Sequence, residues 1–317
     1  MGKSYLADRF AFENVRNFPG GYFRLVLDPK APSTAEALLE ALADRLDIPA
    51  GPDRAAAVRE RLRQPRTLLH VENADSKPAG KVVAALLQNL GGCAVIVSGR
   101  LRDLGRTQGW RQIQVEPFAE PKALQQLWQE LGREPEGAER EEHEELVHAL
   151  GFLPLAIHLA AGHLSSGRSA KRFLHKLRKH GLGLEPADPA ELAGTPEVAR
   201  KILSTSFSLS LEILVEDLGE AAERLLPGLR ALSHAPLTGF GRSLGAAIAG
   251  LSEEDFEDLV ARAQALSILL PMPHGKRPDG AWIVHPLLSE LLRETANPEE
   301  AFLRMTTWFI ARFPKAK

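Results

Sequence analysis

The first third of the chain alternates short apolar runs with helical periods. Tyr22 to Leu27, Thr67 to Val71 and Cys93 to Val97 are apolar runs of the length of a strand. Between them, leucines recur at helical spacing from Leu38 to Leu46, and a second helical period covers Lys81 to Leu90. This alternation predicts a parallel sheet covered by helices on both faces, with ligands bound beyond the carboxyl ends of the strands.

Smaller signals refine this α/β prediction. Ser33-Thr34-Ala35-Glu36 has the character of a helix start, and Gln112 to Val115 predicts one more strand. Glu72 and Arg100 each follow a predicted strand. Both residues are therefore expected at the edge of the sheet where ligands bind.

After Pro117 the pattern becomes helical. Helical periods run from Ala123 to Leu131 and from Glu142 to Leu164, and the chain is helical again from Pro196. Gly181 to Pro189 is rich in Gly and Pro and predicts a connection between domains.

The last segment predicts helices near 219–233, 241–249 and 253–266. Two strands are then expected, Leu266 to Pro271 and Ala281 to Val284, joined by a turn at Gly275 to Gly280. Helices followed by such a hairpin suggest a winged-helix domain. The predicted division is an α/β domain over 1–116, a helical domain over 117–195 and a winged-helix domain over 196–317, which makes the chain mostly α.

Composition narrows the class of protein. The chain has 317 residues, 44% of them hydrophobic, and a formal net charge of -2, so no overall field draws it to nucleic acid or to an anionic membrane. Its one cysteine, Cys93, excludes an internal disulfide and a multi-cysteine zinc site, and its apolar neighbours predict a buried position. No apolar run is long enough for a membrane span, and no signal-peptide core is recognisable, so we expect a cytoplasmic protein.

The chain opens with a fragment of a nucleotide-binding motif. Gly2-Lys3-Ser4 forms the end of a P-loop, G-x-x-x-x-G-K-[ST], in which backbone N–H groups surround the phosphates. In that loop the Lys reaches the β and γ phosphates and the hydroxyl holds Mg²⁺. Alternatively, three common residues recur here by chance and Lys3 is a solvated charge. Motifs further along the chain bear on the choice between these two interpretations.

Five segments in order resemble the motifs of the NB-ARC (STAND) family of signalling P-loop NTPases. That family has a P-loop, a strand ending in an acid, a strand ending in Arg, a G-L-P-L motif and a His in a winged-helix domain. The matching segments are Gly2-Lys3-Ser4, Leu68-Leu69-His70-Val71-Glu72-Asn73-Ala74-Asp75, Val95-Ile96-Val97-Ser98-Gly99-Arg100, Gly151-Phe152-Leu153-Pro154-Leu155-Ala156 and His285-Pro286-Leu287-Leu288. The resemblance covers nearly the whole chain.

The resemblance implies a role for each motif residue. Glu72, where the family usually has Asp, is expected to hold Mg²⁺ or to polarise the attacking water, with Asp75 as a second candidate. Arg100 is expected to sense the γ phosphate, Pro154 to pack near the adenine, and His285 to reach the β phosphate of ADP. The alternatives are a turn-capping acid, a surface charge, a simple helix start and a hydrogen-bonded core histidine, respectively.

One part of the family's fold is missing from the sequence. The strand before the P-loop lies inside the sheet in this family, between the strands that correspond to Cys93 to Val97 and Gln112 to Val115. Neighbouring strands of a sheet lie about 4.8 Å apart. Without this strand, a gap would open in the sheet and the strands on either side of it would each have an unpaired edge. Either the natural protein extends upstream, or the module is degenerate and has lost nucleotide binding. We favour the first, because the residues at matching positions are Lys3, Ser4, Glu72 and Arg100.

The predicted function is an ADP/ATP-dependent molecular switch that is at most a slow ATPase. ADP would hold the domains together, and ATP would release them for self-association. An effector domain upstream and a sensor downstream are implied by the resemblance. The alternative is a winged-helix scaffold or DNA-binding regulator that uses no nucleotide, but the segment after His285, Pro-Leu-Leu-Ser-Glu-Leu-Leu-Arg-Glu, is acidic and apolar and argues against DNA.

Overall fold

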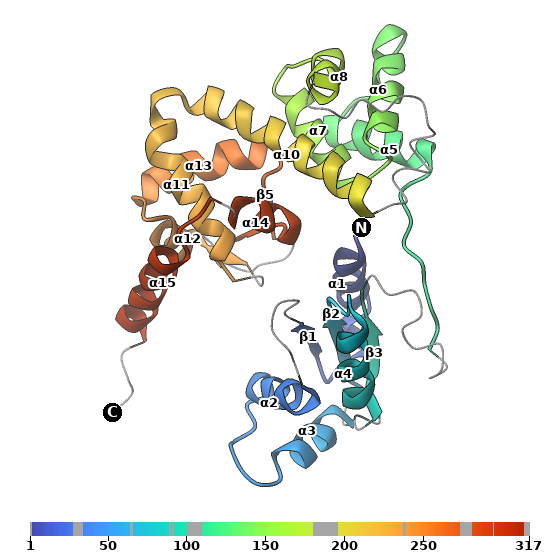
Figure 1. Cartoon of the computed structure of the whole chain (residues 1–317), viewed down its shortest axis with the longest axis vertical. Coiled ribbons are helices and arrows are strands. Elements are labelled where there is room, and N and C mark those ends of the chain that lie inside the picture. The colour runs from blue at the N-terminus through green and yellow to red at the C-terminus, as the bar shows by residue number, and fades with distance from the viewer. Residues whose placement is uncertain are drawn as a thin grey trace. The chain divides into compact units, whose positions relative to one another are not determined.

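The computed structural model describes residues 2–27, 34–63, 66–88, 90, 92–99, 110–179, 196–236, 239–272, 281–293 and 295–313. The chain divides into two compact units, Met1–Val115 (unit 1) and Glu116–Lys317 (unit 2), and each is described by itself (Figure 1). The expected division into three domains, at residues 116 and 195, stays a prediction. Arg100 and the predicted connection at Gly181 to Pro189 lie outside the described residues.

Unit 1 is built on the predicted parallel sheet. Its strands β1 (Tyr22–Val26), β2 (Leu68–Glu72) and β3 (Ala94–Val97) lie in the order β1-β2-β3 and are all parallel. Arg24 stands opposite His70 in the register of β1 and β2. The carboxyl ends of the three strands therefore meet at one edge of the sheet.

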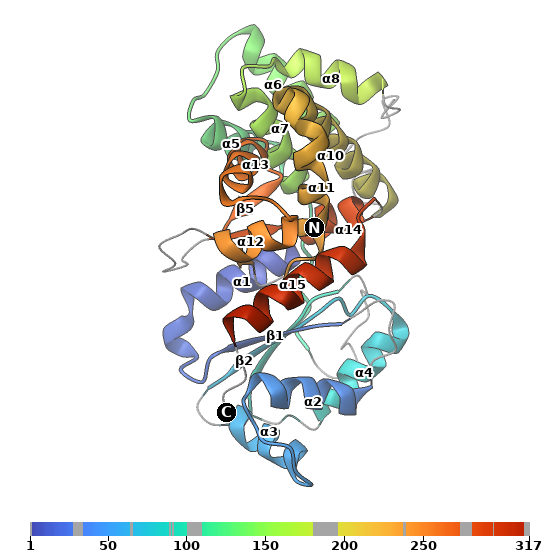
Figure 2. The ribbon, with the colours of Figure 1, turned by 90° about the vertical axis from the view of Figure 1, so that its left-hand side faces the viewer.

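Helices cover both faces of this sheet. They are α1 (Lys3–Glu13), α2 (Ala35–Arg45), α3 (Arg54–Arg63) and α4 (Lys77–Gln88), with a 3₁₀ turn η1 at Val15–Asn17. Figure 2 shows α1 on one side of β1 and β2, and α2, α3 and α4 on the other. The predicted start of α2 is confirmed, because the Thr34 side chain accepts a hydrogen bond from the Ala37 N–H at 3.1 Å.

The two faces of the sheet differ in chemistry. Under α2, α3 and α4 the strands contribute Leu25, Leu69 and Val71 to a buried apolar core. The alternate positions, which face α1, include Tyr22, Arg24, His70 and Glu72 and form a hydrogen-bonded polar layer, described below. The helix can approach this layer closely because its buried positions are Ala7 and Ala11.

Two predictions for the segment around and after β3 were wrong. Gln112 to Val115 forms no strand, and the Ile113 side chain is 70% exposed. Cys93 is half-buried and precedes β3, and β3 itself is an edge strand with Val95 36% exposed. The physical reason is the same in each case: among the described residues the sheet has the order β1-β2-β3, and no further strand continues it beyond β3.

Unit 2 begins with four helices, α5 (Glu120–Leu131), α6 (Ala138–Ala149), α7 (Pro154–Ser165) and α8 (Ala170–Lys179). The single helical period expected from Glu142 to Leu164 is thus two helices. Gly151 and Phe152 adopt positive φ values of 59° and 54°, which end α6, and Pro154 then starts α7.

The rest of unit 2 consists of helices and a small sheet. Its helices are α10 (Pro196–Leu218), α11 (Ala222–Ala231), α12 (Arg242–Ala249), α13 (Glu253–Ala265), α14 (Pro286–Arg293) and α15 (Pro298–Arg312), with 3₁₀ turns η3 (Gly219–Ala221) and η4 (Leu232–His234). Strands β4 (Phe240–Gly241), β5 (Leu269–Pro271) and β6 (Ala281–Val284) form an antiparallel sheet in the order β4-β6-β5. The predicted pair of strands is therefore present, although β5 begins at Leu269 rather than Leu266. The winged-helix assignment stays a prediction.

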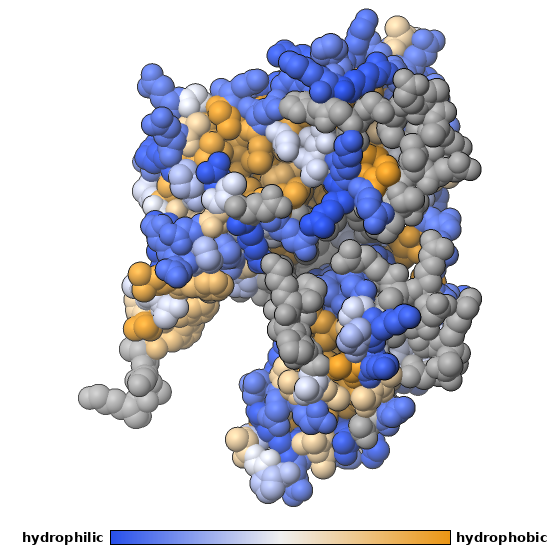
Figure 3. All heavy atoms as spheres, viewed as in Figure 1, coloured by the Kyte–Doolittle hydropathy of each residue, from blue (hydrophilic) through white to orange (hydrophobic). Residues whose placement is uncertain are grey.

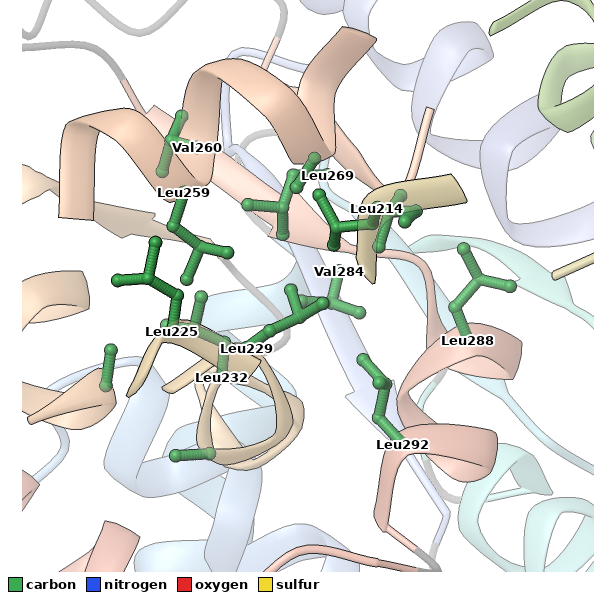
Figure 4. Packing of buried hydrophobic residues seen from close by; sticks show 14 of the residues in the cluster. Leu214, Leu225, Leu229, Leu232, Leu259, Val260, Leu269, Val284, Leu288 and Leu292 are labelled. Atoms are coloured by element: carbon green, nitrogen blue, oxygen red, sulfur yellow. The ribbon is translucent and has the colours of Figure 1, made fainter. Parts of the chain in front are cut away.

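One apolar core joins these elements. In Figure 4, Leu225 and Leu229 of α11, Leu259 of α13 and Val284 of β6 point toward a common centre, with Leu288 of α14 at its side. In contrast, α15 leaves apolar side chains at the surface, where Phe302, Leu303 and Ile310 are exposed (Figure 3). Within the described part of the chain, no helix combines the length and the apolar character needed to cross a membrane.

Candidate functional site

The site begins at the N-terminus of α1. Gly2 caps this helix with φ 83° and ψ 0°, a left-handed conformation that glycine adopts without strain, and a Cβ at this position would meet no atom within 4 Å. The first N–H groups of a helix have no partner inside it and carry the positive end of the helix dipole. The backbone at Gly2, Lys3 and Ser4 is therefore suited to bind an anion such as a phosphate.

Folding brings Ser4 to Glu72, which lies 68 positions away in the sequence. The Ser4 hydroxyl donates a hydrogen bond to Oε1 of Glu72. Glu72 is the last residue of β2 and is only 5% exposed. Two residues that were predicted from segments far apart in the sequence, one as the P-loop hydroxyl and one as the strand-end acid, are thus in direct contact.

Arg24 holds the other oxygen of the same carboxylate. Its Nε lies 2.7 Å from Oε2 of Glu72, and its Nη2 forms an ion pair with the same oxygen. Its remaining nitrogen, Nη1, lies 3.2 Å from Oδ2 of Asp8 on α1. One guanidinium therefore bridges two carboxylates from different elements.

Sequence analysis missed Arg24 and Asp8, although two signals were available. Arg24 is the charged member of the apolar run that forms β1, and a charge inside such a run requires a partner once it is covered. Asp8 stands four residues after Ser4, one turn along α1, and so lies on the same face of that helix.

A second chain of hydrogen bonds starts at Asp8 and ends at Ser98. The Tyr22 hydroxyl donates to Oδ1 of Asp8 at 2.5 Å and contacts Nδ1 of His70 at 2.9 Å, while Nε2 of His70 contacts the Ser98 hydroxyl at 2.8 Å. Because a phenol has one proton and Tyr22 gives it to Asp8, Nδ1–H of His70 must donate to Tyr22, and Ser98 then donates to Nε2. This assignment requires a neutral imidazole.

Burial explains why these groups stay uncharged. It lowers the pKa of His70, and together with the hydrogen bond to Asp8 it raises the pKa of Tyr22. Both groups are therefore neutral near pH 7. Within this hydrogen-bonded layer the charged groups are Asp8, Arg24 and Glu72.

The Ser4 and Glu72 oxygens fit a magnesium ion. Mg²⁺ prefers hard oxygen ligands, and it is usually bound through one or two carboxylates together with phosphates and water rather than by a complete protein cage. In line with this, the described residues contain no group of three or more His, Cys, Asp or Glu side chains that would hold a metal on their own. Asp75, the second metal candidate, lies in the loop between β2 and α4 and is partly exposed.

The remaining predicted site residues lie in unit 2 or outside the described residues, so their roles stay predictions. Pro154 is the first residue of α7, and its carbonyl accepts a hydrogen bond from Nε2 of Gln126 at 3.1 Å. His285 directly precedes α14, where its carbonyl accepts from the Ser289 N–H at 2.9 Å. Both are in unit 2, so unit 1 alone does not bring them to Ser4 and Glu72. Arg100 lies outside the described residues.

A solved structure and two curated proteins are similar to this chain. The structure is that of a Signal Transduction ATPase with Numerous Domains (STAND) protein with a tetratricopeptide repeat sensor, from Pyrococcus horikoshii. It has a TM-score of 0.51 and 13% identity, and the match covers 97% of this chain and 45% of that one. The regulatory protein AfsR of Streptomyces griseus is 33% identical over 182 residues, which is 53% of this chain and 18% of the regulator.

The regulatory protein AfsR of Streptomyces coelicolor is 32% identical over 177 residues, which is 53% of this chain and 17% of that regulator. No protein-family model matches the chain. The chain thus spans less than a fifth of the length of these two relatives. Its fold is similar to that of a STAND-type ATPase, and about half of its sequence is similar to Streptomyces regulatory proteins.

Proposed function

We propose that this chain is the core of an adenine-nucleotide-dependent switch that controls signalling or transcription. The observation that carries the proposal is the contact between the Ser4 hydroxyl and Glu72, at the N-terminus of α1 and the carboxyl end of β2. A phosphate-binding helix end, an ammonium, a hydroxyl and a buried acid are the groups that P-loop NTPases use for nucleotide and Mg²⁺. The fold of the STAND neighbour supports nucleotide binding, and the names of the two relatives support a regulatory output.

Each residue has a defined role in this proposal. The backbone at Gly2 to Ser4 and the Lys3 ammonium bind phosphate oxygens, and Ser4 and Glu72 hold Mg²⁺, with Asp75 as a further candidate. The metal would supply neutralisation of charge on the β and γ phosphates. Glu72 would also polarise the water in a slow hydrolysis.

The NB-ARC-type details belong to the same proposal. Arg100 senses the γ phosphate, Pro154 packs near the adenine, and His285 reaches the β phosphate of ADP. Nucleotide acts as a switch only through different affinities for a closed and an open state. The open state would self-associate.

Calorimetric titration of ADP and ATP with Mg²⁺ tests the proposal. The titrated proteins are the 317-residue chain and a version extended upstream through the open reading frame, each with a Lys3→Ala variant. Loss of a charge-assisted contact to phosphate should weaken binding at least about 30-fold, or about 2 kcal/mol. The matched control is Lys77→Ala, because Lys77 is an exposed lysine that starts α4 in the same unit. It should bind like the wild type.

The outcomes are distinct. Binding that Lys3→Ala removes and Lys77→Ala leaves intact supports the switch. If neither wild-type form binds ADP or ATP, the proposal is wrong and a scaffold that uses no nucleotide takes its place.

A further inference from the structure

We infer that Arg24 is a positioning residue of this site: it holds Glu72 by Oε2 and thereby presents Oε1, beside the Ser4 hydroxyl, to the metal. The inference rests on the proposed function and adds to it a residue that the P-loop motifs do not contain. It also adds Asp8, which holds Arg24 in turn.

The two oxygens of Glu72 have different partners. Oε2 accepts from both Nε and Nη2 of Arg24, whereas Oε1 accepts only from Ser4 among the hydrogen bonds of the described residues. A metal can therefore replace the Ser4 hydrogen bond at Oε1 while the guanidinium stays on Oε2. Partners of this kind fix the orientation of a ligating carboxylate, and their loss typically costs 10–100-fold in metal affinity.

Arg24 is itself fixed from two sides. It comes from the centre of β1, which is paired to β2, and its side chain is 19% exposed. Its third nitrogen contacts Asp8, whose other oxygen accepts the hydrogen bond from Tyr22. The planar guanidinium of an arginine has several N–H groups in fixed directions and can donate to both carboxylates at once. A lysine ammonium on its flexible stem cannot reproduce this geometry.

Asp8 also sets the charge of the cluster. Arg24 and Glu72 alone would be neutral as a pair and would attract a divalent cation weakly. With Asp8 the three groups carry one net negative charge, which favours Mg²⁺ beside Oε1. Because of Asp8, the Arg24 guanidinium can orient the Glu72 carboxylate while the cluster as a whole stays negative.

Charge and positioning predict opposite results for removal of Arg24. If Arg24 acted only as a positive charge near the metal, Arg24→Met would make the cluster more negative and tighten metal binding. If it positions Glu72, the same variant frees the carboxylate to rotate and weakens metal binding in spite of the gain in negative charge. The sign of the change thus decides between the two roles.

The test uses Mn²⁺ as a probe and two measurements on the form of the protein that binds ADP. Electron paramagnetic resonance of free Mn²⁺ gives the metal affinity of the protein–ADP complex, and calorimetry in EDTA gives the affinity for ADP without metal. Arg24→Met should lower Mn²⁺ affinity at least about 10-fold and leave metal-free ADP binding within about twofold. Arg24→Lys should not rescue Mn²⁺ binding, because it restores the charge but not the planar fork.

Two further variants complete the test. Arg9→Met is the matched control, because Arg9 is an arginine of α1 paired with Glu13 at 2.6 Å on the exposed side of the helix; it should leave both affinities unchanged. Asp8→Asn keeps the shape of the side chain but replaces one carboxylate oxygen by an NH₂ group and removes the charge, and it should lower Mn²⁺ affinity several-fold. If Arg24→Met fails to fold by circular dichroism, Arg24→Lys and Asp8→Asn decide the question.

The two levels of the proposal can fail separately. Wild-type protein that binds ADP neither in EDTA nor with Mn²⁺ overturns both the nucleotide switch and the role of Arg24. Unchanged or tighter Mn²⁺ binding by Arg24→Met, or wild-type binding by Arg24→Lys, overturns only the positioning role. Equal losses with and without metal would show that Arg24 is needed for the fold rather than for the metal, and would also overturn it.

Discussion

At the scale of single residues, His163 is a buried histidine of unit 2 whose ring nitrogens have no hydrogen-bond partner among the described residues. It lies on α7, is 0% exposed and packs against the ring of Phe173 at 4.7 Å. Burial, followed by the nearby Arg168, lowers its pKa from 6.5 to about 4. His163 is therefore neutral in the folded protein near pH 7.

This lowered pKa makes stability depend on pH. Between pH 6.5 and about 4 the unfolded chain binds a proton at His163 and the folded chain does not, so the free energy of unfolding falls as the pH falls, by on the order of 3 kcal/mol. His163→Leu should remove this contribution and, by eliminating two unsatisfied nitrogens, stabilise the protein at pH 7 by about 1 kcal/mol.

Urea denaturation at several pH values measures this effect. His148→Leu, which replaces an exposed histidine on α6, serves as the control for the change of histidine to leucine. A His163→Leu protein with an unchanged slope between pH 6.5 and 4 would show that His163 does not contribute to this pH dependence.

At the scale of elements, β3 presents an apolar edge. The strand pairs with β2 on one side, and the described residues provide no strand on the other, where Val95 is 36% exposed. Unpaired N–H and C=O groups beside apolar side chains favour pairing with another chain. Val95→Lys should therefore reduce concentration-dependent association of the 317-residue chain, as measured by sedimentation velocity, with little change in helical circular dichroism.

Leu69 provides the contrast for this prediction. It stands opposite Val95 in the register but is fully buried in the core of unit 1, so Leu69→Lys should unfold that unit. Unchanged association of Val95→Lys would mean that the edge of β3 is not the surface through which copies of the chain meet.

Sequence patterns were most informative where a single physical cause dominates. The parallel strands at 22–26 and 68–72 and the cap of α2 at Thr34 follow from apolar periodicity and local hydrogen bonding. The strand expected at Gln112 to Val115 did not form, because a local pattern shows the tendency to extend but not whether the fold brings a partner strand alongside. Arg24 was missed for a related reason, since its importance comes from Glu72 and Asp8, which only the fold brings to it.

At the scale of the molecule, α10 connects the two parts of unit 2. This helix packs against α7 of the first four helices, and also against α11, α13 and α14 of the rest of the unit. The boundary predicted at residue 195 therefore lies directly before a helix that packs against both parts of unit 2. We expect the two parts to open together rather than as separate domains.

Gly162 of α7 offers a way to test this cooperativity. A Cβ at Gly162 would lie 2.8 Å from the backbone carbon of Leu266 and 2.9 Å from the carbonyl oxygen of Ala265, where α13 ends. Backbone atoms cannot rotate aside, so Gly162→Ala should destabilise unit 2 by about 1–3 kcal/mol, although alanine favours a helix by about 1 kcal/mol. Ser165→Ala, at an exposed position of the same helix, is the control and should be neutral or slightly stabilising.

Native-state hydrogen exchange distinguishes one cooperative unit from two domains. If unit 2 opens as a whole, Gly162→Ala will lower the free energy of opening by the same amount for amides of α7 and of α13. If the parts are independent, α7 alone will lose protection.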